Sequence, residues 1–284
     1  MDKLTLYSPA KINIGLNITE KRADGYHNLE TIFYPLLLSD CLTFEKSDKT
    51  FLTSNSKEIE NLSPNLVLDA ISLLQNFRKK KFDVKIYLEK NIPIGAGLGG
   101  GSSNAAITLK AVNQLFNLNL DYAVLSKLAI ELGSDVPYFL NPVPCFASSR
   151  GEILTKINLT LGQPILIVNP GIHISTKWAF EKLEKKNQNE KLSEVKTKKS
   201  ISLDDIKQIA TNDFEEIVFQ KYPQIETIKN KLYDLGAEFS LMTGTGSTVF
   251  GIFSNLQKAR FAQKVFEQSY FTYLNFPVDK GSIT

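Results

Sequence analysis

The sequence predicts a protein that mixes β-strands with α-helices, because two kinds of apolar periodicity occur in it. Apolar residues alternate over residues 10–18 and 82–88, as in half-buried strands, and they recur at helical spacing over residues 66–77 and 104–116. The chain has 284 residues, enough for one large domain or two ordinary ones. Because the composition shifts near residue 155, we expect two domains, over residues 1–155 and 156–284.

The remaining elements are expected in the following order. Strands are expected at residues 3–7, 29–38, 42–46, 145–154, 165–168, 239–242, 249–253 and 271–276, and helices at 123–132, 176–183, 203–220, 223–235 and 256–269. Residues 47–63 are expected to form a loop. Residues 184–200 are the most polar stretch, and we expect an exposed, mobile connection there. Acids are interleaved with the lysines of this stretch and aromatics are absent, so it does not resemble a nucleic-acid patch.

The composition is that of a globular protein and excludes several classes of partner. The net charge of +3 is small and dispersed, which gives no case for nucleic acid or a membrane. Cys41 and Cys145 are the only cysteines, and their separation predicts a reducing compartment without a disulfide or zinc framework. The two histidines exclude a His-rich metal site. With no signal peptide and no apolar run of transmembrane length, we expect a cytoplasmic protein, or one in an organelle after removal of a leader.

Residues 93–103 are the most distinctive stretch, because five of these eleven residues are glycine and the last two are Ser102 and Ser103. Both serines are good helix N-caps, and a helical run follows at once. Free N–H groups at a helix start carry partial positive charge, so the stretch predicts an anion site, with phosphate the favoured anion. A flexible linker is the alternative, but a linker is not expected between a strand and a periodic helix.

The pattern also narrows the class of phosphate loop. No glycine is followed by lysine, so a Walker loop is absent. Residues 95–100 satisfy G-x-G-x-x-G, but Asp121, the acidic residue about twenty positions on, opens a helical run where a dinucleotide site needs the end of a strand. A protein-kinase glycine loop is followed by a strand, whereas a helix follows here.

Three further places carry candidate ligand-binding side chains. Lys11 and Asn13 share one face of the first long strand with Gly15 and Asn17, and these small polar groups suit a ligand cleft, although a surface strand remains open. Tyr26 and His27 follow an Asp-Gly turn that could present them to a ligand, although a surface or capping role for His27 is open. Asp135 lies in a turn between Gly133 and Pro137, where it could equally bond to its own backbone.

Residues 8–13, 93–103 and 241–247 resemble, in order and spacing, the three motifs of the GHMP kinase superfamily. The flanking residues 21–27 and 133–137 resemble the branch that phosphorylates 4-diphosphocytidyl-2-C-methyl-D-erythritol in the non-mevalonate isoprenoid pathway. The resemblance implies an α+β fold with a domain like domain 2 of ribosomal protein S5 and a C-terminal α/β sandwich, with the active site in the cleft between them. It further implies ATP and Mg2+ as cofactors, a substrate with a cytidine diphosphate moiety, and a monomer or weak homodimer.

The resemblance also implies residue roles. Asp135 would accept the proton of the attacking C2 hydroxyl, and Lys11 would hold Asp135 ionised and stabilise developing charge. The implied substrate-binding set is Asn13, Tyr26, His27, Asp135, Thr176 and Phe180, with Tyr26 and Phe180 stacking on the base and His27 hydrogen-bonding to it. The implied ATP-binding set is Asn65 and Leu66 for adenosine and, for the phosphates, Pro93, Ile94, Gly95, Ala96, Gly97, Leu98, Gly99, Gly100, Gly101, Ser102 and Ser103. A protein ligand for Mg2+ stays unassigned, with the Ser103 hydroxyl as a candidate.

Two alternatives stay open at this point. A mevalonate- or homoserine-type kinase would keep the glycine loop but lack a cytosine site, and Tyr26 with His27 speaks against it. A catalytically inactive relative that serves as a binding protein would be favoured by loss of Lys11 or Asp135, and both are present.

Overall fold

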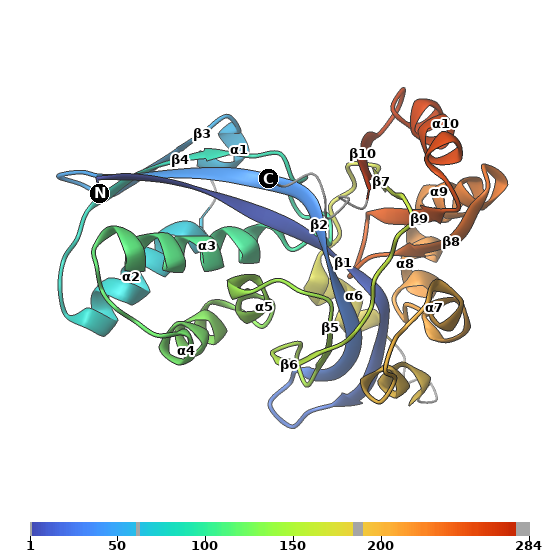
Figure 1. Ribbon diagram of the computed structural model, residues 1–284, viewed down its shortest axis with the longest axis horizontal. Coiled ribbons are helices and arrows are strands. Elements are labelled where there is room, and N and C mark those ends of the chain that lie inside the picture. The colour runs from blue at the N-terminus through green and yellow to red at the C-terminus, as the bar shows by residue number, and fades with distance from the viewer. Residues whose placement is uncertain (1, 61–62, 184–189, 277–284) are drawn as a thin grey trace. The chain divides into compact units, whose positions relative to one another are not determined.

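The computed structural model describes residues 2–60, 63–183 and 190–276, and the chain divides into two compact units. Unit 1 comprises residues 2–11, Pro35–Ile94 and Gly99–Val143; unit 2 comprises Ile12–Tyr34, Gly95–Leu98 and the described residues from Pro144 onward. Both units contain helices and strands, so the predicted α+β class is confirmed (Figure 1). Each unit is built from segments far apart in the sequence. The expected boundary at residue 155 stays a prediction.

Unit 1 places helices against one face of a sheet (Figure 1). Its strands come from β1 (Lys3–Lys21), β2 (His27–Lys46), β3 (Phe51–Ser54) and β4 (Val84–Glu89), and its helices are α1 (Lys57–Glu60), α2 (Leu66–Arg78), α3 (Gly100–Leu115), α4 (Tyr122–Leu132) and α5 (Val136–Leu140). β2 pairs antiparallel with β4, and β3 pairs parallel with β4. Phe44, Leu74, Leu109 and Phe139 are fully buried and form part of the core, so the apolar periodicity correctly predicts which faces turn inward.

Three expectations about unit 1 are wrong in detail. Residues 47–63 were expected as a loop but include β3 and α1, which are only four residues each and too short to show a period. The strands expected at 29–38 and 42–46 are the single strand β2. α3 begins at Gly100 with Gly99 as N-cap, at φ 72° and without a side-chain cap. Glycine adopts this left-handed conformation readily. Ser102 and Ser103, which were expected as N-caps, therefore lie inside the first turn of α3.

Unit 2 contains an antiparallel four-stranded sheet with helices and, outside that sheet, a hairpin whose first strand pairs antiparallel with residues 31–33 of β2. The hairpin strands are β5 (Cys145–Ser148) and β6 (Ile153–Lys156), where one strand was expected, and the sheet has the order β10 (Phe271–Asn275), β7 (Ile165–Asn169), β9 (Val249–Phe253), β8 (Ala237–Met242). The helices are α6 (Thr176–Lys182), the 3₁₀ helix η1 (Glu190–Lys196), α7 (Leu203–Ile209), α8 (Glu215–Lys221), α9 (Pro223–Asp234) and α10 (Leu256–Phe266). α9 and α10 pack on the sheet, with Ile228, Val249 and Ala262 in the core.

The polar stretch expected as an exposed, mobile connection is partly structured. Residues 184–189 lie outside the described residues, but 190–196 form η1, in which Leu192 and Val195 are buried. The Leu192 side chain packs against Gly15, in the space that a larger side chain at that position would need. A Cβ added to Gly15 would lie 3.0 Å from Leu192 Cδ1. Two apolar residues in a polar run are therefore enough to attach this segment to the core.

The helix expected over residues 203–220 is two helices, α7 and α8. The break contains Asn212, whose amide donates to the carbonyl oxygens of Met242 (2.7 Å) and Gly244 (2.9 Å). Because these bonds fix residue 212 outside a helix, they divide the two helices. The break in turn supports the second glycine-rich loop, residues 243–247.

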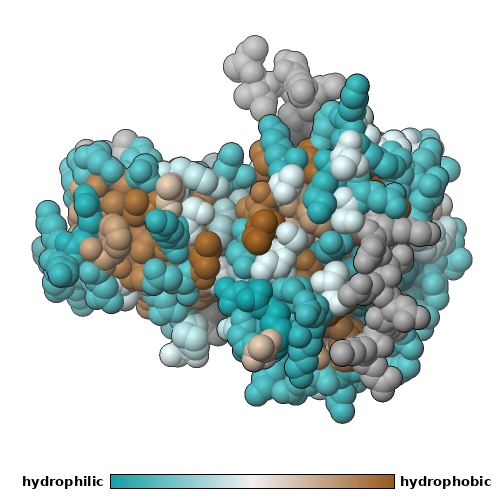
Figure 2. Space-filling view, turned by 90° about the horizontal axis from the view of Figure 1, so that it is seen from below, coloured by the Kyte–Doolittle hydropathy of each residue, from teal (hydrophilic) through white to brown (hydrophobic). Residues whose placement is uncertain are grey.

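The surface alternates between hydrophilic and hydrophobic areas. Figure 2 shows one face, on which patches of hydrophobic residues are bordered by hydrophilic ones. Exposed large apolar side chains include Phe77 and Tyr122 in unit 1 and Phe261 in unit 2. Among the helices of the described residues, none is both long and apolar enough to cross a membrane.

Candidate active site

Lys11 and Asp135 form an ion pair in unit 1, with Lys11 Nζ 3.5 Å from Asp135 Oδ2. The side chain of Lys11 is 5% exposed and that of Asp135 is 34% exposed, so the carboxylate is the accessible member. Asp135 precedes α5 but makes no side-chain capping hydrogen bond there, which argues against the role of a turn-former. A Cβ at Gly99 would lie 3.2 Å from Lys11 Cε. The pair therefore lies beside the N-cap of α3.

The second half of the glycine loop also lies in unit 1. The Ser8 hydroxyl donates to the Ser103 hydroxyl at 2.7 Å, and both residues are fully buried. Leu66 lies against Gly101, because a Cβ there would be 3.7 Å from Leu66 Cδ1. The Asn65 side chain caps α2 by accepting from the Val67 N–H at 3.0 Å. Leu66 and the loop are thus brought together, and Asn65 holds the start of the helix that carries Leu66.

The first half of the loop, Gly95–Leu98, lies in unit 2 against the second glycine-rich loop. A Cβ at Gly97 would lie 2.5 Å from the carbonyl oxygen of Thr243 and 3.0 Å from that of Gly246. A Cβ at Gly95 would lie 2.3 Å from Nδ1 of His173. Residues 243–247 form the β8–β9 hairpin and also support the phosphate loop, since glycine is required where the two backbones approach.

The polar face of β1 is buried, so the surface-strand alternative is wrong. Asn13 and Asn17 are each 3% exposed. The Asn13 main-chain N–H donates to the Thr243 hydroxyl at 2.8 Å, and its side-chain amide donates to the Thr31 hydroxyl at 2.8 Å. The amide of Asn17 donates to the Thr211 hydroxyl at 3.0 Å. Segments distant in the sequence cover this face, which the strand pattern alone could not reveal.

His27 and Phe180 come together in unit 2, with stacked rings whose centroids are 5.0 Å apart. Phe180 also meets Phe214 edge-on at 4.9 Å. Burial lowers the pKa of His27, and the nearby charge of Lys21 lowers it further, so the imidazole is neutral at neutral pH. A neutral imidazole offers one hydrogen-bond donor and one acceptor. His27 is accordingly a partly buried polar group and not a helix cap.

Tyr26 is 55% exposed and is held by the turn that precedes it. Its N–H donates to Asp24 Oδ1 at 3.1 Å, and Asp24 also accepts from Arg22. Arg22 donates onward to the Ser149 hydroxyl at 3.2 Å. The guanidinium carbon of Arg150 lies 4.6 Å from the centre of the Tyr26 ring. The turn between β5 and β6 therefore fixes one face of a ring that remains accessible to a ligand.

Thr176 opens α6, and its hydroxyl lies 3.4 Å from the hydroxyl of Thr245 in the second glycine-rich loop. The structure thereby brings Thr176 together with the hairpin that also contacts Gly97. Thr176 lies one turn before Phe180 on the same helix.

Within the described ranges, no group of three or more His, Cys, Asp or Glu side chains could hold a metal ion. Asn104, the fifth residue of α3, is 2% exposed, and its amide oxygen has no hydrogen-bond partner among the described residues. An amide oxygen is a ligand type that suits Mg2+.

Several residues of this region were not predictable from the sequence. His173 and Arg150 contact loop residues far away in the sequence, so no local pattern could assign them. Asp40 interrupts an otherwise apolar run, and this polar interruption was the available signal of a buried charge.

Two models of protein families match this chain, and each matched range contains one of the two glycine-rich loops. Residues 65–141 match the model of the N-terminal domain of GHMP kinases, and residues 193–271 match that of the GHMP kinase C-terminal domain. The two matched ranges contain α2–α5 and α7–α10, respectively.

Two relatives that are similar in sequence carry the same name. The chain is 44% identical over 256 residues to a protein of Bacteroides fragilis (strain YCH46) named 4-diphosphocytidyl-2-C-methyl-D-erythritol kinase, covering 88% of this chain and 92% of that protein. It is 39% identical over 277 residues to one of the same name from Thermodesulfovibrio yellowstonii, covering 93% and 94%. A crystal structure of 4-(cytidine 5'-diphospho)-2C-methyl-D-erythritol kinase superposes with a TM-score of 0.78 at 30% identity, covering 96% of this chain and 98% of that one. A mevalonate kinase superposes with a TM-score of 0.72 at 19% identity over 96% and 98% of the two chains, which indicates a shared fold.

Proposed function

We propose a function from one premise: this chain belongs to the GHMP kinase family and, within it, to the 4-diphosphocytidyl-2-C-methyl-D-erythritol kinases. The chain is an ATP-dependent small-molecule kinase. Its reaction is transfer of the ATP γ-phosphoryl group to the C2 hydroxyl of 4-diphosphocytidyl-2-C-methyl-D-erythritol, a step of non-mevalonate isoprenoid synthesis. The observation that carries the proposal is the ion pair of Lys11 and Asp135 beside the N-cap of α3.

In the proposed mechanism, Asp135 is the general base. Its accessible carboxylate accepts the proton of the hydroxyl as that oxygen bonds to the γ-phosphorus. The bond from this phosphorus to the bridging oxygen breaks, and ADP leaves with the electron pair. A positioned base contributes about 10²–10⁴-fold to the rate. The ammonium of Lys11, 3.5 Å from the carboxylate, stabilises negative charge that develops on the transferring group.

The main chain of residues 93–103 would bind the ATP phosphates. Support comes from the positive φ angles of Gly95, Gly97 and Gly99 and from the lack of room for a Cβ at all three. Leu66, in contact with Gly101, would pack against adenosine, and Asn65 would hold it there.

We also propose Mg2+ as the second cofactor, since phosphate transfer requires charge neutralisation that this ion supplies when bound. The donors present fit a site shared with the nucleotide. Asn104 has a buried amide oxygen without a partner among the described residues. The Ser103 hydroxyl is engaged with Ser8, so it would bind the ion or one of its waters only while accepting from Ser8.

The cytidine end would bind through Tyr26, His27 and Phe180. The accessible ring of Tyr26 offers a stacking surface worth about 1–3 kcal/mol per base in nucleic-acid proteins. The neutral imidazole of His27 can both donate to and accept from the base edge. Phe180 has His27 against one face, so a base would stack on that face only after His27 moves aside. Asn13 and Thr176, both beside the second glycine-rich loop, would complete the substrate site.

We further propose a cytoplasmic monomer or weak homodimer without nucleic-acid or membrane partners. Support comes from the small net charge and from Cys41 and Cys145, which are both free thiols. Light scattering after size-exclusion chromatography would give a mass near 31.8 kDa, or a dimer that dissociates on dilution. A stable higher oligomer would contradict this proposal.

The experiment that tests the function is ADP release from Mg-ATP with three acceptors: 4-diphosphocytidyl-2-C-methyl-D-erythritol, mevalonate and homoserine. The proposal predicts turnover with the first acceptor only. Turnover with another acceptor would keep the kinase chemistry and overturn the substrate. If folded protein binds ATP but turns over none of them, the inactive binding-protein alternative is favoured.

A further inference from the structure

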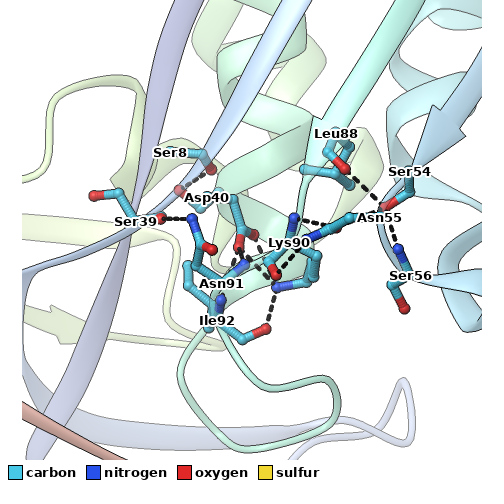
Figure 3. Close-up of polar contacts among 11 residues, drawn as sticks. Ser8, Ser39, Asp40, Ser54, Asn55, Ser56, Leu88, Lys90, Asn91 and Ile92 are labelled. Carbon is cyan, nitrogen blue, oxygen red and sulfur yellow. Dashed lines mark hydrogen bonds and ion pairs between the residues drawn. The ribbon is translucent and has the colours of Figure 1, made fainter.

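A buried ion pair outside the proposed catalytic pair lies at the entrance to the phosphate loop. Asp40 is fully buried, and its carboxylate lies 2.8 Å from Nζ of Lys90, whose side chain is 7% exposed. The same carboxylate accepts hydrogen bonds from the main-chain N–H groups of Asn91 and Ile92, both at 2.8 Å. Figure 3 shows Lys90, Asn91 and Ile92 gathered around Asp40. Neither member of the pair has a part in the mechanism above.

The position of the pair follows from the register of the sheet. β2 and β4 pair antiparallel, and their last matched residues are Cys41 and Glu89. Asp40 and Lys90 are the next residues along the two strands, where main-chain pairing ends. The Asp40 side chain takes over the N–H groups of Asn91 and Ile92, so it fixes the path of the chain directly before Pro93.

The ammonium of Lys90 also reaches the far end of the loop. It donates to the carbonyl oxygen of Ile92 on the entry side. A Cβ at Gly100, the first residue of α3, would lie 3.2 Å from Lys90 Nζ and 3.1 Å from Ile92 Cγ2. One side chain therefore contacts both the residue that enters the loop and the residue that begins the helix after it. The two ends of the phosphate loop are held next to one another.

Stability alone is a poor explanation for this pair. Burial lowers the pKa of Lys90, while the Asp40 carboxylate opposes that shift. A cation near a helix N-terminus is unfavourable with respect to the helix dipole. Buried ion pairs are often no more stabilising than apolar residues of similar volume. What the pair does contribute is a defined geometry at both ends of a loop that is otherwise rich in glycine.

We propose that Asp40 and Lys90 are positioning residues that fix the phosphate loop in the conformation that binds the ATP phosphates. The proposal rests on the proposed function, because it takes residues 93–103 as the phosphate site. Glycine gives the loop access to many conformations, and an anchor at both ends lowers the cost of ordering it upon binding. Loss of the anchor would therefore weaken nucleotide binding even in a protein that remains folded.

The test is binding of ADP, followed by isothermal titration calorimetry, to the full chain and to the double variant Asp40→Asn/Lys90→Met. The double variant leaves no unpaired buried charge, so it should stay folded where the single variants lose stability. The expected result is ADP affinity lower by roughly 10-fold, because the loop must then be ordered when the nucleotide binds. In turnover assays, the KM for ATP should rise while the KM for the acceptor stays unchanged.

A matched control is the pair of Lys198 and Asp205 in unit 2, with side chains 34% and 28% exposed. Its double variant, Lys198→Met/Asp205→Asn, should change thermal stability without changing ADP affinity. If the Asp40/Lys90 double variant does not fold, Lys90→Arg serves instead. It keeps the charge but replaces the ammonium, which donates to the Ile92 carbonyl oxygen, with a larger planar guanidinium, so ADP affinity should again fall.

The outcomes separate the two proposals. If the folded double variant binds ADP as tightly as the wild type, the positioning role is overturned and the proposed function stays intact. The same holds for Lys90→Arg where that variant replaces the double variant. Failure of the wild-type chain to bind ADP would overturn both, because residues 93–103 would then not be a phosphate site. Wild-type binding of ADP without turnover of the expected acceptor would overturn the substrate only, and the affinity comparison would still decide on Asp40 and Lys90.

Discussion

The ammonium of Lys11 lies 3.5 Å from the carboxylate of Asp135, although one residue is in the middle of a strand and the other precedes a helix. The two differ in exposure, because the Lys11 side chain is almost completely buried and about a third of the Asp135 side chain is accessible. This asymmetry matches a pair in which the lysine is fixed and the aspartate faces a reactant.

Asp135→Asn should reduce kcat by about 10²–10⁴-fold, because the amide cannot accept the proton. The amide is nearly isosteric, so ADP affinity and the melting temperature should stay close to those of the wild type. Steady-state kinetics and calorimetry measure these quantities. Asp121→Asn is the control in the same unit, since asparagine also caps helices and Asp121 caps α4. An unchanged kcat in Asp135→Asn would remove Asp135 from the mechanism.

Gly97→Ala should impair nucleotide binding because a Cβ there would lie 2.5 Å from the main-chain oxygen of Thr243. Gly171→Ala is the matched control: its φ of 73° is almost the same as the 76° of Gly97, but nothing lies within 4 Å of the added Cβ. Both variants bear the strain of the left-handed conformation, about 1–2 kcal/mol. ADP affinity from calorimetry should fall only in Gly97→Ala, and equal affinities in the two variants would refute contact between the loops as the reason for glycine.

Tyr26→Ala should cost about 1–3 kcal/mol of substrate binding if the ring stacks on cytosine. Tyr26→Phe should be mild, because it keeps the ring and its contact with Arg150. The KM of the acceptor, or direct binding of CDP, compares the two. Equal losses in both variants would argue against stacking and assign the effect to the hydroxyl.

His27 should make the stability of the protein depend on pH. Because burial lowers its pKa below the usual value of 6.5, the unfolded chain takes up a proton before the folded chain does as the pH falls. The free energy of unfolding should therefore be unaffected by His27 above pH 6.5 and should decrease as the pH drops through 6.5 toward the folded-state pKa. Urea unfolding between pH 7.5 and 5.5 measures this change. His27→Gln should lose less stability over that range, and identical losses would show that His27 does not titrate abnormally.

Long periodic segments were predictable from the sequence, whereas contacts between distant segments were not. α2 and β4 follow their apolar periods closely, and the glycine loop was recognised because its composition is unusual. The short elements β3, α1 and η1 have no period to detect. The stack of His27 on Phe180 depends on packing between residues far apart in the sequence, so it required the structure.

Asp40 is a charged residue whose position was visible in the sequence but whose partner was not. It lies between the two strands that were expected at residues 29–38 and 42–46, but the structure shows one strand with the carboxylate buried against Lys90. A pattern can mark such a residue as unusual. Only the fold identifies the partner that makes its burial possible.

The most direct measurement for the central claim is a phosphorus NMR spectrum of the wild-type chain with Mg-ATP and 4-diphosphocytidyl-2-C-methyl-D-erythritol. The account predicts one new phosphomonoester resonance, formed in step with ADP while the diphosphate resonances of the acceptor persist, and no such resonance over the same period with Asp135→Asn. ADP formation accompanied only by inorganic phosphate would contradict the account, because ATP would then be hydrolysed and no phosphoryl group transferred.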